Sequence, residues 1–357
     1  MLSLRFLALS AFLLTGVVAC KKEKETPAEP ALVYTTVSTL AGNGTDGFTD
    51  GNGTVAQFYG PEGAIMDGQG NVYVADAGNS SIRKITPAGM VSTLAGNGTV
   101  GFVNGNLAAA RFDSPVDVAL DGQGNLYVAD YGNHCVRKIT PLGVVSTLAG
   151  TGIAGFVDGG AATAQFNGPN GLAIDGQGVI YVSDYDNNRI RKVMPNGTVS
   201  TLAGTGQRGF ADGPGSSAQL SGPEGLALDG QGNLYVAEFA GQRIRKIAPD
   251  RMVSTLAGTG IRGYADGAGS TAQFYGVSGL ALDAHGDLLV ADAGNYCVRK
   301  VTPAGVVSTV AGTRTAGFAD GAVGIAQFQT LSGITVGSRG TLYITEYGER
   351  IRKITSE

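Results

Sequence analysis

Short apolar runs alternate with glycine-rich polar turns along almost the whole chain. Residues 117–120 and 126–129 are β-branched or aromatic runs, and the turn Asp-Gly-Gln-Gly-Asn at 121–125 separates them. This pattern is typical of two antiparallel strands joined by a tight turn. Residues 136–139 and 144–148 predict a second hairpin directly after the first. The pattern therefore predicts a unit of four antiparallel strands.

The same unit recurs six times at a fixed spacing. The string Val-Ser-Thr-Leu/Val-Ala-Gly begins at six positions that lie 54 residues apart: Val37, Val91, Val145, Val199, Val253 and Val307. Six such units predict an all-β, six-bladed β-propeller with four-stranded antiparallel blades. A solenoid is the alternative, but it needs atypical capping units at its ends, and this sequence has none.

The two ends of the repeat array complement each other. The array opens at Val37–Leu40, which is fourth-strand sequence, and stops at Ile351–Thr355, which is third-strand sequence. Pairing the N-terminal strand with the last blade would complete that blade and remove two exposed sheet edges. We therefore expect the N-terminal strand to close the ring.

The repeat resembles a known family. The run Pro-Glu-Gly-Leu-Ala-Leu-Asp-Gly-Gln-Gly-Asn-Leu-Tyr-Val-Ala-Glu at 223–238, followed by Arg-Ile-Arg-Lys-Ile at 243–247, resembles an NHL repeat. The resemblance covers roughly residues 33–355 and implies a six-bladed propeller. WD40 and kelch propellers fit less well, because both rely on tryptophan and this chain has none. Val277 and Leu331 replace the proline of the motif, which affects local loops only.

The N-terminus predicts export. Arg5 gives a positive start, and the apolar run Phe6–Val18 is too short to span a bilayer comfortably. The following Val-Val-Ala-Cys, which ends at Cys20, resembles the lipobox of bacterial lipoproteins. An ordinary signal peptide that contains a cysteine is the alternative.

The lipoprotein interpretation sets the domain boundaries. Residues 1–19 would be the signal peptide, and residues 20–32 would be the lipidated Cys20 with a charged, proline-containing tether. Residues 33–357 would be the NHL-repeat propeller. We expect the protein to be exported and lipid-anchored to a bacterial membrane, on its periplasmic or cell-surface side.

Charge argues against a nucleic-acid partner. The formal net charge is −4, whereas nucleic acids and anionic membranes favour basic surfaces. One third-strand arginine recurs in every unit: Arg83, Arg137, Arg191, Arg245, Arg299 and Arg352. One acid recurs at the end of every second strand: Asp76, Asp130, Asp184, Glu238, Asp292 and Glu346. Because the arginines and the acids occur in equal numbers, they favour one charge-assisted pair in each blade. The alternative is a basic ring that binds RNA, since some NHL domains resemble RNA-binding proteins.

Metal and catalytic signals are sparse. An aspartate precedes glycine in five inter-blade segments, which suits a plain turn or, alternatively, calcium: Asp50, Asp158, Asp212, Asp266 and Asp320. His134 and His285 fall on opposite faces of the disc and cannot share an ion. Glu62, Asn170 and Glu224 share one repeat column and resemble the Glu/Asn/Asp metal cage of related six-bladed lyases and lactonases.

A binding role is favoured over an enzymatic one. No nucleophile–base motif is visible, and we expect no cofactor. The favoured function is an extracytoplasmic, membrane-anchored binding or scaffold module. The alternative is a propeller lyase or hydrolase, lactonase-like, with a metal in the central channel.

Two variable repeat columns predict where a ligand binds. Positions that differ between blades are free for function, and one such column follows the second strand: Ala77, Tyr131, Tyr185, Phe239, Ala293 and Tyr347. The other enters the first strand: Glu62, Val116, Asn170, Glu224, Ser278 and Ser332. Both columns should meet at the mouth of the central channel. We expect a monomer whose partner is a protein, peptide or glycan.

Two smaller features complete the expectations. Cys135 and Cys297 occupy the same repeat position three blades apart, so they are too distant for a disulfide. The recurring Asp-Gly and Ala-x-Phe between units, as at 158–166, predict a short helical turn that the alanine and phenylalanine anchor.

Overall fold

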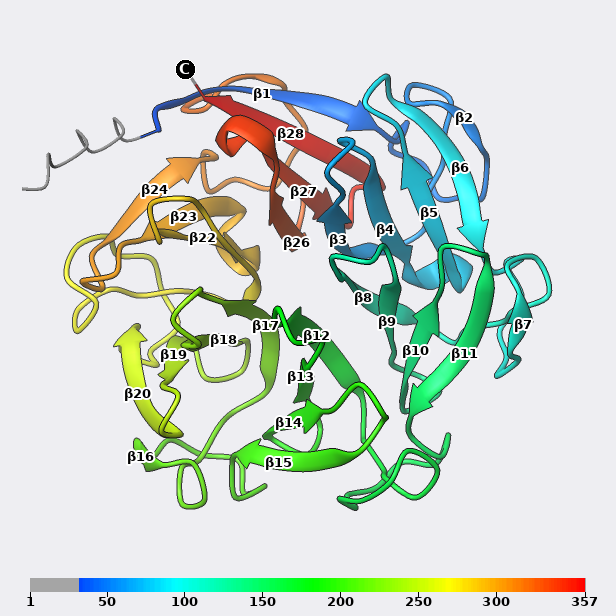
Figure 1. Ribbon diagram of the computed structural model, residues 1–357. Coiled ribbons are helices and arrows are strands. Elements are labelled where there is room, and N and C mark those ends of the chain that lie inside the picture. The colour runs from blue at the N-terminus through cyan, green and yellow to red at the C-terminus, as the bar shows by residue number, and fades with distance from the viewer. Residues whose placement is uncertain (1–31, 357) are drawn as a thin grey trace, which may run out of the picture. The chain divides into compact units, whose positions relative to one another are not determined.

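The computed structural model describes residues 32–356, which form six antiparallel sheets arranged as a ring (Figure 1). This confirms the predicted all-β six-bladed propeller. Cys20, the signal peptide and all but the last residue of the predicted tether lie outside the described residues. Within residues 32–356, no helix has the length and hydropathy needed to cross a bilayer.

Each blade contains four main strands, which follow one another from the channel outward. Blade one has β3 (Pro61–Met66), β4 (Val72–Asp76), β5 (Ser81–Ile85) and β6 (Met90–Ala95). Blade two has β8 (Pro115–Leu120), β9 (Leu126–Asp130), β10 (Cys135–Ile139) and β11 (Val144–Ala149). Blade three has β12 (Pro169–Ile174), β13 (Ile180–Asp184), β14 (Arg189–Val193) and β15 (Val199–Ala203).

The remaining blades repeat this order. Blade four has β17 (Pro223–Leu228), β18 (Leu234–Glu238), β19 (Arg243–Ile247) and β20 (Met252–Ala257). Blade five has β21 (Val277–Leu282), β22 (Leu288–Asp292), β23 (Cys297–Val301) and β24 (Val307–Ala311). Blade six has β26 (Leu331–Val336), β27 (Leu342–Glu346), β28 (Arg350–Ser356) and β1 (Tyr34–Ala41). Three short 3₁₀ turns, η1 (Ala77–Asn79), η2 (Ala293–Asn295) and η3 (Ser338–Gly340), lie in loops.

The inter-blade segments extend the outer edges of the sheets. Four blades carry a two-residue strand outside the fourth strand: β2 (Gly51–Asn52), β7 (Gly105–Asn106), β16 (Gly213–Pro214) and β25 (Gly321–Ala322). In blades three and five a single bridge takes that place, Gly159 with Val199 and Gly267 with Val307. These additions cover sheet edges that would otherwise be open to pairing with other chains.

Each inter-blade segment also contains the predicted helical turn. The Ala56 N–H donates to the Asn52 carbonyl at 2.9 Å, an i to i−4 bond, and Ala56 and Phe58 are fully buried. Ala164, which donates to Gly160, and Phe166 repeat this arrangement between blades two and three. The alanine and the phenylalanine anchor the segment, as expected.

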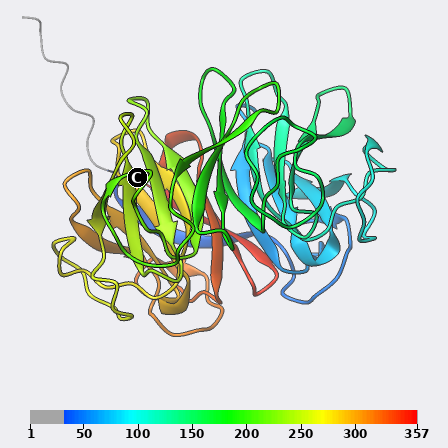
Figure 2. The ribbon, with the colours of Figure 1, turned by 90° about the horizontal axis from the view of Figure 1, so that it is seen from below.

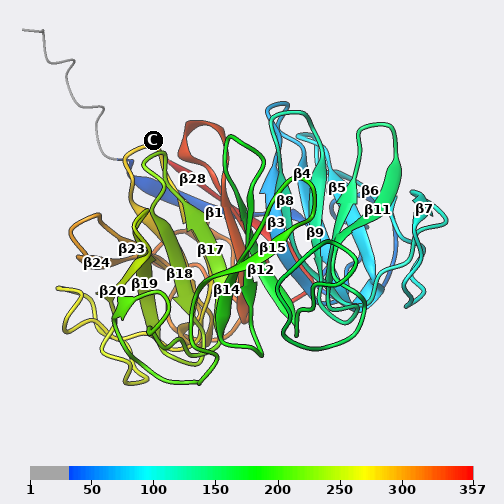
Figure 3. The same cartoon turned by 60° about the horizontal axis from the view of Figure 1, so that its bottom comes forward.

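The N-terminal strand closes the ring as predicted. β1 pairs antiparallel with β28, and Val37 lies opposite Ile354 while Thr39 lies opposite Arg352. Val37 is buried. Figures 1 and 3 show β1 and β28 side by side in one blade, on the perimeter of the ring.

The hydrophobic core lies between neighbouring blades. One cluster joins Ala75 and Ile82 of blade one to Val118 and Val128 of blade two, and Phe112 of the connecting segment completes it. Because each blade buries its faces against two neighbours, the ring has no terminal blade that needs a polar cap. Edge-on, residues 32–356 form a disc with loops on both faces (Figure 2).

The recurring arginines hold the blades together from inside. Arg83 contacts Asp76 and Asp50, both at 2.7 Å, and its guanidinium lies between the Phe48 and Phe58 rings, 4.9 and 5.0 Å from their centroids. All six recurring arginines are fully buried and paired with the acid that ends the second strand. This confirms the predicted pair in each blade, and these arginines form no surface for RNA.

The arginines also account for the aspartates that precede glycine. Each of these carboxylates accepts a bond from the second nitrogen of the arginine in its own blade. In blade two, Asn104 takes the aspartate's place and bonds Arg137 at 2.8 Å. The calcium alternative is therefore disfavoured, because the guanidinium occupies one side of each carboxylate.

The cysteines give the first testable expectation. Cys135 and Cys297 are free and buried in opposite blades. Burial raises the pKa of both thiols above its usual value, so neither should react with a thiol reagent in the folded protein. Both should react fully after unfolding without reductant. Recovery of a Cys135–Cys297 disulfide by mass spectrometry would contradict the six-blade geometry.

Candidate functional site

The two faces of the disc differ in the parts of the blade that they expose. We name the entry face as the one where the innermost strands begin, as β3 does at Pro61, and where the second strands end, as β4 does at Asp76. The turn face is the opposite one, which carries the first hairpin turns such as residues 67–71. The predicted ligand residues all belong to the entry face.

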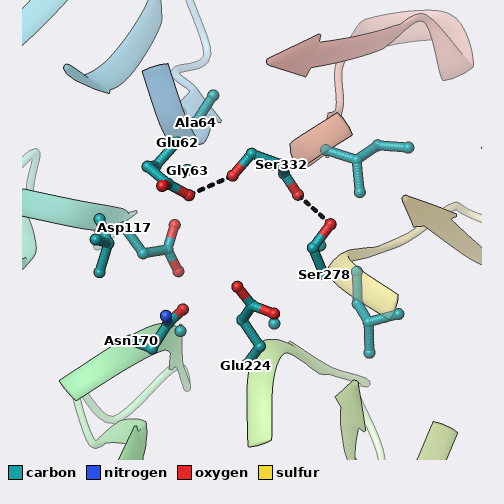
Figure 4. A pocket seen from close by; sticks show the side chains of 15 residues that line it. Glu62, Gly63, Ala64, Asp117, Asn170, Glu224, Ser278 and Ser332 are labelled. Atoms are coloured by element: carbon teal, nitrogen blue, oxygen red, sulfur yellow. Dashed lines mark hydrogen bonds between the residues drawn. The ribbon is translucent and has the colours of Figure 1, made fainter. Parts of the chain in front are cut away.

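Six polar side chains gather around the axis where the inner strands begin. They line a cavity of about 40 Å³, with apolar residues such as Leu280 and Ile334 among its walls: Glu62, Asp117, Asn170, Glu224, Ser278 and Ser332 (Figure 4). The predicted column of Glu62, Asn170 and Glu224 is therefore brought together at the channel mouth. Asp117 also reaches the channel and was missed from the sequence.

The inner strands approach each other so closely that five of the six blades have glycine at the repeat position that follows Glu62, Asn170 and their equivalents. A Cβ added to Gly171 would stand 2.1 Å from the Glu224 carbonyl oxygen, and one added to Gly225 would stand 2.3 Å from that of Ser278. Asp117 is the exception in this column. An acid in a column of glycines was the available signal.

Two hydroxyl groups position the glutamates. The Ser183 hydroxyl donates to the backbone carbonyl of Glu224 at 2.6 Å, and the Thr345 hydroxyl donates to that of Glu62. The other four blades have alanine at this position, one residue before the buried acid. Both hydroxyls belong to the blade that precedes the glutamate, so each glutamate is oriented from a neighbouring sheet. This role was not predicted from the sequence.

The three carboxyl groups have very different partners. Glu62 accepts hydrogen bonds from the Ser332 and Tyr347 hydroxyls. Asp117 accepts the backbone N–H groups of Val118 at 2.8 Å and Leu172 at 2.7 Å. Glu224 accepts none from residues 32–356, and its Oε2 is buried without a partner there. Figure 4 shows its carboxyl directed into the channel.

Burial and mutual repulsion make these groups weak acids. Burial and the nearby Glu62 raise the pKa of Glu224 to about 8. Burial raises the pKa of Asp117 to about 7, with a further contribution from Glu62, although two backbone donors act against the shift. Burial also raises the pKa of Glu62. Near neutral pH the channel mouth therefore holds carboxyl groups that can either accept or donate a hydrogen bond.

These side chains do not form a metal cage as they stand. Within residues 32–356, no group of three or more His, Cys, Asp and Glu side chains is arranged to hold an ion. The oxygens of Glu62 and Asp117 already bind hydroxyl or amide donors. The resemblance to a Glu/Asn/Asp cage therefore does not extend to the arrangement of the donor atoms.

Aromatic side chains surround the channel mouth. The Tyr347 hydroxyl reaches Glu62, and the Tyr131 hydroxyl donates to Asp186 at 3.4 Å. Phe239 and Tyr347 remain 38% and 48% exposed. A Cβ added to Gly222, which leads into the next blade, would stand 3.3 Å from the Tyr185 ring. The predicted aromatic residues therefore lie on the entry face, and Tyr347 is in direct contact with the channel carboxyls.

The two alanine positions of this column are compensated. Blades one and five have Ala77 and Ala293 there. In these blades a tyrosine from another position, Tyr59 or Tyr275, packs beside the glycine that follows the alanine. Every blade therefore contributes an aromatic side chain to the entry face, which a single repeat column could not reveal.

The histidines keep to separate places. The Gly168 N–H donates to Nδ1 of His134 at 3.2 Å, and Gly222 makes the equivalent bond to Asn188 at 3.0 Å. His134 therefore joins two blades on the entry face. His285 lies in a hairpin turn on the turn face, where it lines a different cavity. This confirms the prediction that they cannot share an ion.

Comparison with known proteins agrees with this architecture. The NHL repeat family matches residues 112–139 and 166–193, which cover the three inner strands of blades two and three with the residues that lead into them. The chain is an NHL-repeat six-bladed β-propeller.

The relatives of this NHL propeller are much longer proteins, and the chain matches only a part of each. Protein SUPPRESSOR OF QUENCHING 1, chloroplastic, of Arabidopsis thaliana is 31% identical over 281 residues, which cover 73% of this chain and 27% of that protein. Teneurin-3 of Danio rerio is 30% identical over 233 residues, which cover 56% of this chain and 8% of that protein. The chain thus spans about a quarter of the first relative and less than a tenth of the second.

A solved structure shares the fold. An auxiliary nutrient binding protein from Bacteroides thetaiotaomicron superposes with a TM-score of 0.70 at 17% identity, over 90% of this chain and 76% of that one. At this identity the similarity establishes the fold alone.

Proposed function

We propose that this NHL propeller is an extracytoplasmic binding module, lipid-anchored through Cys20, whose entry face binds a protein, peptide or glycan. One observation carries the proposal. The entry face combines partly exposed aromatic rings with channel carboxyls, and both occupy positions that the repeat leaves variable. Large rigid aromatic side chains are common anchors at binding sites. Binding is also the role in the name of the Bacteroides protein.

The aromatic side chains on the entry face provide the test of the binding site. Tyr185→Ala and Phe239→Ala should each weaken the binding of a probe by at least about 1 kcal/mol, because truncation removes an anchor at the rim. The measurement is the affinity of the purified variants for immobilised peptides and glycans that bind the wild-type protein. Melting temperatures should change little, because neither side chain belongs to the buried core.

His285→Ala is the matched control, since it removes a ring from the turn face. It should leave probe binding unchanged. Normal binding by both aromatic variants, together with loss of binding in the His285 variant, would place the site on the turn face and contradict the proposal.

The membrane anchor has its own test. Cys20→Ala should move the protein from the membrane fraction to the soluble fraction, because the acylated residue would be lost. A single acyl chain anchors only marginally, so stable attachment requires the several chains of a bacterial lipoprotein. Full retention of the variant in membranes, measured by fractionation and immunoblotting, would contradict the lipoprotein assignment.

A further inference from the structure

The channel mouth gathers carboxyl groups without any basic side chain. Three carboxyl groups line the cavity, from Glu62, Asp117 and Glu224, and its lining contains no lysine, arginine or histidine. Titratable groups on surrounding elements near the mouth include the Tyr131, Tyr185 and Tyr347 side chains and Asp186. Arg208 is close enough to act on Tyr185. A ligand group that entered this mouth would meet acceptors and aromatic rings.

Glu224 is the group that lacks a partner. Glu62 and Asp117 each have two donors from the protein, whereas no donor within residues 32–356 reaches either oxygen of Glu224. Leaving a buried carboxylate without a hydrogen bond is costly. The Ser183 hydroxyl nevertheless fixes the backbone of Glu224 so that its side chain faces the channel. The unused acceptor and its fixed orientation point to a donor that the ligand supplies.

The dimensions of the mouth restrict that donor. A cavity of about 40 Å³ has room for a small polar group. An ammonium group on a slender alkyl stem can enter while its methylenes lie against the rim. Aromatic faces such as those of Tyr131 and Tyr185 favour cations and their stems.

We propose that the channel mouth binds a primary ammonium group, delivered by a lysine side chain of a peptide or protein, with Glu224 as its principal acceptor. This inference rests on the proposed binding function and specifies its ligand. An ammonium nitrogen sits about 2.8 Å from its acceptor oxygens, whereas calcium and magnesium need several oxygens within about 2.0–2.6 Å. The absence of a metal-holding group among residues 32–356 is thus compatible with an ammonium ligand.

The carboxyl groups give the interaction a pH dependence. Because the pKa of Asp117 is about 7 and that of Glu224 about 8, both are mostly protonated at pH 6 and mostly ionised at pH 9. Lysine remains largely charged across that range. Binding of the ammonium group should therefore strengthen as the pH rises from 6 to 9.

The experiment uses two matched peptides, acetyl-Gly-Lys-Gly-amide and the same peptide with norleucine, which keeps the stem and lacks the charge. Titration calorimetry or NMR shifts at constant ionic strength should show binding of the lysine peptide at pH 9. Compared with wild-type protein and the lysine peptide at pH 9, binding should be at least about tenfold weaker in each of three cases. These are wild-type protein at pH 6, the Glu224→Gln variant at pH 9, and the norleucine peptide at pH 9. Asp250→Asn, which removes an exposed charge on the turn face, is the control and should bind normally.

Other outcomes overturn the proposal. Equal affinity of wild-type and Glu224→Gln protein for the lysine peptide, or no binding at either pH, would reject it. Displacement of the lysine peptide by calcium chloride at one ion per protein would identify a metal site instead. Glucosamine binding as tightly as the lysine peptide would identify an amino sugar as the ligand source.

The melting temperature of Glu224→Gln separates loss of the site from loss of the fold. It should not fall, because an amide of the same shape replaces a carboxyl group whose Oε2 has no hydrogen-bond partner within residues 32–356. A different result is that Tyr185→Ala and Phe239→Ala lose binding of the immobilised peptides and glycans while Glu224→Gln keeps it. That result would retain the proposed function and reject only this inference.

Discussion

Deletion of β1 (Tyr34–Ala41) is expected to destabilise the whole propeller by about 3–6 kcal/mol. Burial of Val37 accounts for about 1.5–3 kcal/mol of this. β28 and β25 also lose the hydrogen bonds that they make with β1, which lies between them. Because water replaces β1 at the new sheet edges, each lost bond costs a net of only about 0.5–1.5 kcal/mol. The loss is a large part of a typical net stability of about 5–15 kcal/mol.

Thermal or urea unfolding of the truncated protein measures this effect. The matched control is a deletion of residues 21–30, which also shortens the N-terminal region but leaves β1 intact. The control should unfold like the parent. If the β1 deletion melted within a degree or two of the parent, pairing of Val37 with Ile354 could not be what closes the ring.

Replacement of a buried arginine is expected to have the second large effect. Arg191→Met removes the guanidinium that contacts Asp184 at 2.7 Å and Asp158 at 2.6 Å. Asp184 is fully buried, so its carboxylate would be left without a counter-charge at a cost of about 3–5 kcal/mol. Asp158 is 45% exposed and should contribute little, because water screens it.

The repeat supplies a matched comparison within the same chain. Arg137→Met removes the same kind of pair with Asp130, but Asn104 stands in place of the second carboxylate. It should cost nearly as much as Arg191→Met, because the fully buried acid dominates. Arg191→Met combined with Asp184→Asn should recover part of the loss. A cost below about 1 kcal/mol for Arg191→Met by urea unfolding would contradict a structural role for these pairs.

The architecture was predictable because the repeat presents the same pattern six times. The 54-residue spacing and the complementary ends led to the ring and to the pairing of Val37 with Ile354, which β1 and β28 confirm. The short strands β2, β7, β16 and β25 were not predicted. Two residues are too few to show the alternation that identifies a strand.

The candidate site was predictable only where the repeat columns vary strongly between blades. Glu62, Asn170 and Glu224 were found because their column differs between blades, and all three line the channel. Asp117 was missed because its column is otherwise glycine, and Ser183 because its column is mostly alanine. Their roles depend on close approach between neighbouring sheets, which is a property of the ring rather than of one repeat.

The partnerships of the acids depend on the folded ring. The aspartates that precede glycine suited a turn or a calcium ligand on sequence grounds. Each lies 33 residues before an arginine of its own blade, or 32 in blade six, and only the fold brings the two together. The lack of a partner for Glu224 among residues 32–356 likewise follows from the directions of the surrounding donors, which no spacing in the sequence encodes.

Hydrogen exchange measured with and without a bound probe from the peptide and glycan panel tests the central claim most directly, because it locates the binding face without any substitution. We predict slower exchange in residues 167–171 and 239–242, at the channel mouth and rim of the entry face. Residues 229–233 and 283–287, which form hairpin turns on the turn face, should exchange at unchanged rates. Protection of those turns with no change at the channel mouth would contradict the assignment of the entry face as the binding face.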